Sequence, residues 1–264
     1  MQFETSPIFI ISALNRSGTN YLANILTATG EYAIPENIGE DYLMVYSDKL
    51  ESYFLETTKH WSKHYRENSR ALDDILAKFG IFFEEFFLER IPTSKRLLLK
   101  CPRPYNISNI FKFFPNAKVL IVERSAKDTI SSFFSSFPEY SFYQSVDLFF
   151  KGSCELNAFF TKNKESGQVM KVKYKDLINN NEVAISALGE FCNVPRSSLD
   201  PINQPLIGSS ELKKQEGHIH WKPIEKPKNF NPVGRYKNWS LYKKIIYRLL
   251  KLKYSSRFPE DTVF

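Results

Sequence analysis

The chain of 264 residues is short of cysteine and histidine and has no long apolar segment, and these shortages exclude several classes of protein. Its three cysteines, Cys101, Cys154 and Cys192, lack CxxC spacing, which argues against a disulfide framework and for free thiols in a reducing compartment. No apolar run approaches the length of a membrane-spanning helix. The first residues also lack the basic region and long apolar region of a signal peptide. We therefore expect a cytoplasmic protein.

The composition that remains is typical of a packed globular protein. Hydrophobic residues make up 42% of the chain, aromatic residues make up 15%, and phenylalanine alone occurs 23 times. The length and the absence of internal repeats predict one domain, residues 1–264. The formal net charge of +7 favours an anionic partner, but it does not distinguish a phosphate ligand from nucleic acid or acidic lipid.

The stretch with the clearest pattern is PIFIISALNRSGTNYLANIL, residues 7–26. Residues 7–13 are apolar and β-branched, which predicts a buried strand. Residues 14–18 form a polar turn, and residues 19–29 have the apolar spacing of a helix. The backbone N–H groups and the dipole at a helix start attract anions, and Gly18 allows close approach of a phosphate. The further donors of this stretch are Arg16, Ser17 and Thr19.

The same stretch lacks three residues of a nucleotide-binding P-loop. Ala13 occupies the position of the first glycine, and Gly18 is followed by Thr19 and Asn20 instead of Lys-Ser/Thr. A lysine for the terminal phosphate and a hydroxyl for magnesium are therefore absent. The loop predicts phosphate binding without a metal, and the alternative is an ordinary strand–turn–helix with a chance arginine.

Further along the chain, apolar strands alternate with helices, which predicts an α/β fold with a P-loop-like central parallel sheet flanked by helices. The later strands are residues 96–100, 118–123 and 168–172, and helical patterns cover residues 47–91, 107–114, 140–164 and 180–192. The phenylalanines of residues 81–91 are most simply core. Residues 193–240 are rich in Pro, Asn, Gly and Lys and predict a long loop, which is followed by a basic amphipathic helix at residues 241–253.

Three cations follow the ends of predicted strands. They are Arg16, Lys100 and Arg124. Because ligands of parallel sheets bind beyond the carboxyl ends of the strands, we expect these side chains to converge on one anion.

These residues resemble the sulfotransferases that use 3′-phosphoadenosine 5′-phosphosulfate (PAPS). That family holds the 5′-phosphosulfate in a loop of the form Lys/Arg-Ser-Gly-Thr-Thr followed by an aromatic or aliphatic residue. The matching residues here are Arg16, Ser17, Gly18, Thr19, Asn20 and Tyr21. Its second signature is an arginine at a strand end and a serine eight positions later, which together bind the 3′-phosphate. Arg124 and Ser132 match it.

Two later landmarks of the family also occur in order. Tyr174 begins a Tyr-Lys-Asp-Leu segment that resembles the family's Tyr-Glu-Asp-Leu, whose tyrosine lies near the adenine. Residues 233–239 resemble its Gly-x-Trp-x-Asn segment. The Arg-Lys-Gly triplet of some cytosolic members is not evident, and Lys228 or Arg235 is the candidate replacement on the 3′-phosphate. Other departures from the family pattern are Asn20, Lys175 and the pair Ser125-Ala126.

The catalytic base distinguishes branches of this family. Members that act on phenols and steroids carry Lys-Thr-His after the second strand, whereas this chain reads Lys100, Cys101, Pro102. Bacterial carbohydrate and tyrosylprotein sulfotransferases place a glutamate soon after the first helix. The resemblance therefore implies that Glu36 is the base, with Glu40 in reserve, and that Arg16 and Lys100 neutralise the leaving phosphate.

The predicted activity is in-line, metal-independent transfer of a sulfuryl group from PAPS to an acceptor hydroxyl on a carbohydrate, lipid, small molecule or peptide tyrosine, leaving PAP (3′-phosphoadenosine 5′-phosphate). One alternative is a P-loop-type kinase, which would need the missing lysine and magnesium ligand. A second is a non-enzymatic module that binds anions, membrane or nucleic acid, although its cations should spread along a face with interleaved aromatics. We expect no nucleic-acid partner and regard membrane contact by the C-terminal helix as secondary. His218 and His220 are weak evidence for a metal.

Overall fold

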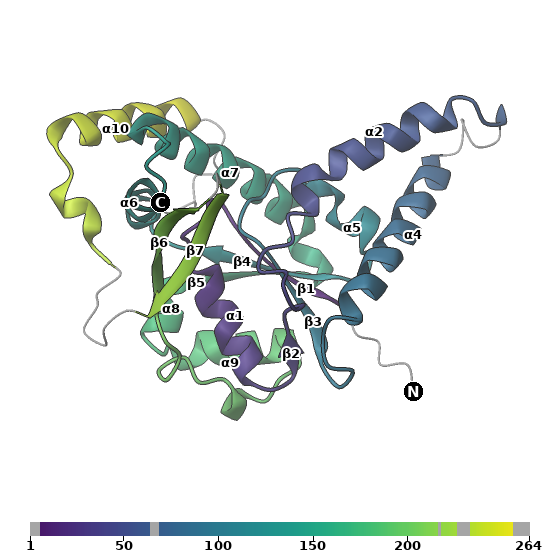
Figure 1. Cartoon of the computed structure of the whole chain (residues 1–264), viewed down its shortest axis with the longest axis horizontal. Helices are drawn as coiled ribbons and strands as arrows, with labels where there is room; N and C mark the ends of the chain where they lie inside the picture. Colours follow the sequence, from purple (N-terminus) through teal and green to yellow (C-terminus); the bar gives the residue numbers. More distant parts are fainter. Residues whose placement is uncertain (1–5, 64–68, 216–217, 226–232, 256–264) are drawn as a thin grey trace.

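The computed structural model describes residues 6–63, 69–215, 218–225 and 233–255, and its centre is a five-stranded, all-parallel sheet (Figure 1). The strand order is β2-β3-β1-β4-β5. The strands are β1 (Ile8–Ser12), β2 (Tyr32–Ala33), β3 (Arg96–Cys101), β4 (Lys118–Glu123) and β5 (Val169–Lys173). In the register, Ile10 lies beside both Lys100 and Leu120, so the ends of β3 and β4 flank the end of β1.

Side chains alternate between the two faces of the central strand and form two cores. Ile8 and Ile10 point to one core, and Phe9 and Ile11 point to the other. The helices over the first core are α1 (Thr19–Ala28), α8 (Tyr174–Ile178) and α9 (Glu182–Cys192). Those that contribute to the second core are α2 (Ser47–Thr58), α4 (Ser69–Leu88), α5 (Ile110–Phe113) and α7 (Phe142–Asn163). This two-sided burial explains why the strands are continuously apolar.

A third cluster joins α6 (Ala126–Ser136), α7 and α10 (Leu241–Ser255) at the rim of the molecule (Figure 1). Gly152 allows α7 to lie directly on the segment after β1, because a Cβ there would be 2.0 Å from the carbonyl oxygen of Ala13. The short 3₁₀ helices are η1 (Met44–Tyr46), η2 (Ile107–Asn109), η3 (Lys164–Ser166), η4 (Arg196–Ser198) and η5 (Arg235–Asn238).

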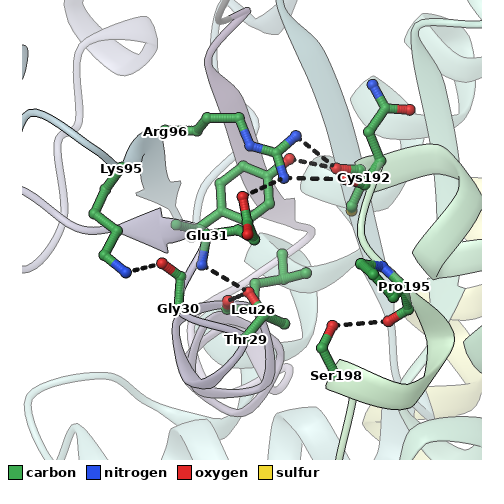
Figure 2. Close-up of polar contacts among 11 residues, drawn as sticks. Leu26, Thr29, Gly30, Glu31, Lys95, Arg96, Cys192, Pro195 and Ser198 are labelled. Carbon is green, nitrogen blue, oxygen red and sulfur yellow. Dashed lines mark hydrogen bonds and ion pairs between the residues drawn. The ribbon is translucent and has the colours of Figure 1, made fainter.

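At the amino edge of the sheet, Arg96 ties the start of β3 to the end of α9 (Figure 2). Its guanidinium donates to the carbonyl oxygens of Cys192 at 3.0 Å and Asn193 at 3.2 Å, and it lies 4.2 Å from the centre of the Tyr32 ring. A cation at the carboxyl end of a helix is favoured by the helix dipole. This contact fixes the end of α9 against the sheet, at the edge opposite the ends of β1, β3 and β4.

The fold class predicted from the sequence is confirmed, and the strands lie within a residue or two of their predicted bounds. Two strand regions were missed. The two-residue strand β2 falls in an expected loop, and the expected loop of residues 193–240 contains an antiparallel pair, β6 (Ile207–Gln215) and β7 (His218–Glu225). The sequence of β6 lacks the regular apolar alternation that signals a strand, and the alternation of β7 covers only residues 218–222 before Pro223, a residue that disfavours a strand.

The aromatic run before β3 is only partly core. Phe87 is buried and Phe83 packs against the core, but Phe82 and Phe86 are exposed. The run lies on an amphipathic helix, so its aromatic residues point to more than one side. Across the described residues, no helix has both the length and the apolar character that crossing a membrane would need.

Candidate active site

The loop between β1 and α1, residues 14–18, has an unusual backbone. Arg16 and Gly18 both adopt positive φ angles, +77° and +103°. The hydroxyl of Ser17 donates to the carbonyl oxygen of Leu14 at 2.7 Å and pins the turn. Gly18 is the N-cap of α1, has no capping side chain, and is followed by no acidic residue in the first turn. The first N–H groups of α1 are therefore available to an anion.

Lys100 lies at the end of β3 and contacts the first turn of α1. Its Nζ donates to Oδ1 of Asn20 at 2.6 Å. Burial lowers the pKa of Lys100, while the nearby carboxylates of Glu40 and Asp41 raise it. The ammonium group is thus partly desolvated at the helix N-terminus, where its interaction with an anion would be stronger than in bulk water.

Arg124 lies at the end of β4 and connects three segments. Its Nη1 donates to the carbonyl oxygen of Arg16 at 2.7 Å, and its guanidinium lies 5.0 Å from the centre of the Tyr174 ring. Tyr174 begins α8 directly after β5 and contacts Gly18 so closely that a Cβ there would be 2.3 Å from its ring. Tyr21 meets the same ring edge-on, with centroids 5.8 Å apart. The β1–α1 loop and the ends of β4 and β5 therefore form one surface.

A cavity of about 440 Å³ opens beside this surface, and Ser17, Arg124, Asp128 and Tyr174 contribute to its lining. Asp128 accepts a hydrogen bond from the N–H of Gly234 at 2.8 Å, which brings the start of η5 to the first turn of α6. Ser132 is buried one helical turn beyond Asp128.

A chain of hydrogen bonds connects the β1–α1 loop to a glutamate. The guanidinium of Arg103 donates to Oδ1 of Asn15 at 3.0 Å, and Nδ2 of Asn15 donates to the hydroxyl of Tyr42 at 3.4 Å. The hydroxyl of Tyr42 in turn donates to Oε2 of Glu40 at 2.5 Å. Burial and the adjacent Glu40 raise the pKa of Tyr42, so it stays a neutral donor. Tyr42, two positions after Glu40 in the chain, therefore holds Glu40 near the β1–α1 loop.

Asp41, the next residue, is anchored to the end of β3. Its N–H donates to the carbonyl oxygen of Lys100 at 3.0 Å, and its Oδ1 accepts from the N–H of Leu43 at 2.9 Å. Its Oδ2 is buried without a hydrogen-bond partner among the described residues. Burial raises the pKa of this carboxyl to about 7, with a smaller contribution from Glu40 and opposition from Lys100.

Glu36 occupies a different part of the same segment. Its N–H donates to the carbonyl oxygen of Arg90, which precedes β3, whereas Asp41 pairs with Lys100 near the end of β3. The side chain of Glu36 is exposed, and no hydrogen bond or ion pair of it occurs within the described part of the chain. Of the two glutamates implied by the resemblance, the structure brings Glu40 to the β1–α1 loop and leaves Glu36 in solvent.

The other residues implied by the resemblance lie on elements that meet at the carboxyl edge of the sheet. Those on the β1–α1 loop, on α1 and at strand ends are Arg16, Ser17, Gly18, Thr19, Asn20, Tyr21, Lys100, Arg124 and Tyr174. Arg235 is the first residue of η5, directly after Gly234. Lys228 lies outside the described residues. Among those described, no cluster of three or more metal-ligating side chains occurs.

Sequence reasoning missed four polar residues of this region: Asn15, Asp41, Arg103 and Asp128. Asn15 directly precedes Arg16, and Arg103 lies three positions after Lys100. Their closeness in sequence to the predicted cations could have marked both as site residues. The burial of Asp41 has no local signal, because it results from the pairing of its backbone with β3.

The model of the sulfotransferase family matches residues 7–198 of this chain. The search of curated proteins finds no match to this chain. Among solved structures, the sulfotransferase domain of the Synechococcus PCC 7002 olefin synthase is similar with a TM-score of 0.54 and 14% identity, over 98% of each chain. Mouse sulfotransferase SULT7A1 complexed with PAP gives a TM-score of 0.52 and 14% identity, over 96% of this chain and 86% of that one. At these identities the likeness to solved structures is one of fold.

Proposed function

The chain belongs to the sulfotransferase family, and we propose that it transfers a sulfuryl group from PAPS to the hydroxyl of an acceptor, with Glu40 as the general base. The observation that carries the proposal is the arrangement around α1. An uncapped helix N-terminus, a half-buried lysine and a tethered glutamate lie around the β1–α1 junction. A similar fold, that of mouse SULT7A1, holds PAP, the product expected from this donor.

The residues around α1 suit the two phosphate groups of such a donor. The N–H groups at the start of α1 would bind the 5′-phosphosulfate, with Lys100 beside them. Arg124 and Ser132 would bind the 3′-phosphate, assisted by Arg235. Gly18 supports this assignment, because its positive φ forms the turn before α1 and its lack of a side chain lets the Tyr174 ring lie against the loop.

The donor supplies an activated sulfuryl group whose departure leaves negative charge on a phosphate oxygen. Lys100 would neutralise that charge, since it is held by Asn20 at the helix N-terminus. Arg16 adds a second cation from the loop itself. Charge on the departing group is the main obstacle in transfers of this kind, so positioned cations are the expected contribution of the protein.

Glu40 would accept the proton of the acceptor hydroxyl as that oxygen attacks. The hydrogen bond from Tyr42 fixes the orientation of its carboxylate. Asn15 of the β1–α1 loop donates to Tyr42 and is itself held by Arg103. Glu36 remains the alternative base, and it would require the segment between the two glutamates to rearrange.

The test compares two matched variants, Glu40→Gln and Glu36→Gln, which keep the shape of the side chain and remove the proton acceptor. We expect Glu40→Gln to lower turnover of sulfate from labelled PAPS by about 10²–10⁴-fold, and Glu36→Gln to leave it nearly unchanged. The acceptor is chosen beforehand by screening the wild type against carbohydrate, lipid, phenol and tyrosine hydroxyls. The opposite ranking of the two variants would return the role to Glu36.

Donor binding is measured separately by calorimetry with PAP in the absence of magnesium. Both glutamine variants should bind PAP as the wild type does, because the carboxylate faces the acceptor. If the protein does not bind PAP and binds ATP only in the presence of magnesium, the proposed donor is refuted and phosphoryl transfer is supported.

A further inference from the structure

Helix α10 has one apolar face that packs on the protein. Tyr247, Leu250 and Tyr254 are buried, and the rings of Tyr247 and Tyr254 lie 5.7 and 5.8 Å from the ring of Phe150 on α7. Figure 1 shows α10 running along the rim of the molecule beside α7. This face explains why the helix is held in place.

The same helix carries a second apolar stripe that faces solvent. Leu241 is 73% exposed, Ile245 45%, Leu249 61% and Leu252 69%. Their spacing of four, four and three residues aligns them along the whole helix, about 180° around it from the buried face. A second stripe of large aliphatic side chains is not needed for packing, because the first face already supplies it.

The charges of α10 are all of one sign. Leu241–Ser255 contains five lysine and arginine residues and no aspartate or glutamate, so it accounts for most of the net charge of +7. Lys244, Arg248 and Lys251 are exposed along one flank of the stripe, and Lys253 lies on the other. Lys253 is 3.5 Å from Asp147, the carboxylate of α7 that also binds Lys151.

We propose that α10 binds the surface of a membrane that contains anionic lipid. A helix with a solvent-facing aliphatic stripe between lysine and arginine residues can lie in the plane of the lipid interface, its apolar side chains among the acyl chains and its cations among the headgroups. With 15 residues it is about 22 Å long, too short to span a bilayer but long enough to lie on it.

The charge pattern favours this partner over two others. A symmetric contact between two copies through the stripe would bring two rows of cations together, which is unfavourable. Single-stranded nucleic acid is bound by cations interleaved with aromatic rings, whereas this stripe is mainly Leu and Ile. An anionic bilayer satisfies both the cations and the aliphatic side chains.

The experiment is cosedimentation of the full chain with vesicles of phosphatidylcholine alone and with a quarter of phosphatidylserine. We expect binding to the second kind only, weakened by salt. The triple variant Lys244→Gln, Arg248→Gln, Lys251→Gln should lower the partition coefficient on the order of 100-fold. The double variant Leu249→Ser, Leu252→Ser should lower it by roughly tenfold or more, because it removes the inserted groups.

Matched control variants distinguish binding by α10 from effects of overall charge and of exposed apolar groups elsewhere. The triple variant Lys49→Gln, Lys78→Gln, Lys162→Gln removes the same charge from exposed positions on other helices and should bind as the wild type does. Val183→Ser removes an apolar group that is 81% exposed on α9 and should also have no effect. PAP binding by every variant shows that it is folded, and it tests the donor site independently of the membrane.

Three outcomes would overturn the proposal. The first is equal binding to both kinds of vesicle, and the second is equal loss of binding in the control triple variant. The third is a wild-type dimer in light scattering that the Leu249→Ser, Leu252→Ser variant dissociates, which would assign the stripe to a second copy of the chain.

Discussion

The buried carboxyl of Asp41 makes the stability of the fold depend on pH, and Asp41→Asn should remove that dependence. The fold raises the pKa of this group from 3.8 to about 7, mainly by burial, although the N–H of Leu43 and the charge of Lys100 oppose the shift. The native protein therefore holds this proton over a pH range in which the unfolded chain has released it. In that range the native state binds more protons, so the free energy of unfolding falls as the pH rises.

The size of the effect follows from the shift. Each pKa unit corresponds to 1.36 kcal/mol, so a rise from 3.8 to about 7 costs the wild type about 4 kcal/mol above pH 7, of which about 2 kcal/mol accumulates between pH 5 and pH 7. Part of Asp41 remains accessible to solvent, and we therefore expect about 2–3 kcal/mol in practice. Asparagine cannot ionise and still offers an oxygen to the N–H of Leu43.

The assay is urea unfolding of the wild type and Asp41→Asn at about pH 5 and pH 8.5, extrapolated to water. The wild type should lose about 2–3 kcal/mol relative to the variant between the two conditions, because all other titrating groups are shared. Asp74→Asn, at an exposed position on α4, is the matched control and should track the wild type. A difference between the wild type and Asp41→Asn that stays constant with pH would refute the reasoning.

Three further substitutions test separate contacts. Gly18→Ala should cost about 1–2 kcal/mol of stability, because it places a side chain at positive φ. It should also weaken PAP binding, since the new Cβ displaces the Tyr174 ring. Unchanged PAP affinity in calorimetry would contradict a role of the Gly18–Tyr174 contact in binding. Arg124→Ala should weaken PAP binding by about 2–5 kcal/mol without unfolding the chain. If the wild type binds adenosine 5′-phosphosulfate, which lacks the 3′-phosphate, as tightly as PAPS, then Arg124 serves another ligand. Arg96→Ala should lower the free energy of unfolding by about 1–3 kcal/mol, because the carbonyl oxygen of Cys192 loses a charged donor, and should leave PAP affinity as it was.

The residues of β1 and of the turn into α1 were readable from the sequence because their signals are local. The run of residues 7–13 is apolar throughout since β1 is covered on both faces, and Gly18 marks the tight turn into α1. The order of strands and cations in the sequence also predicts that Lys100 and Arg124 lie near Arg16. Parallel strands place their carboxyl ends at one edge of the sheet, so the ends of strands must converge.

The position of the glutamates was decided only by the tertiary structure. Glu36 and Glu40 lie four residues apart in one loop of the sequence, and nothing local distinguishes them. The pairing of β2 with β3 directs the chain back along the sheet, and the contact of Asp41 with Lys100 then sets Glu40 beside the β1–α1 loop. These partners are about 60 residues apart in sequence, and such non-local pairing leaves no periodic pattern in either segment.

The same distinction applies to α10. Its apolar and basic residues are evident in the sequence as an amphipathic helix, and they predict that one face is buried. Which apolar side chains pack on Phe150 and which face solvent depends on the rotation of the helix against α7. The helical period determines which residues of α10 share a face. Which face becomes buried depends on the shape of the surface of α6 and α7 on which the helix packs.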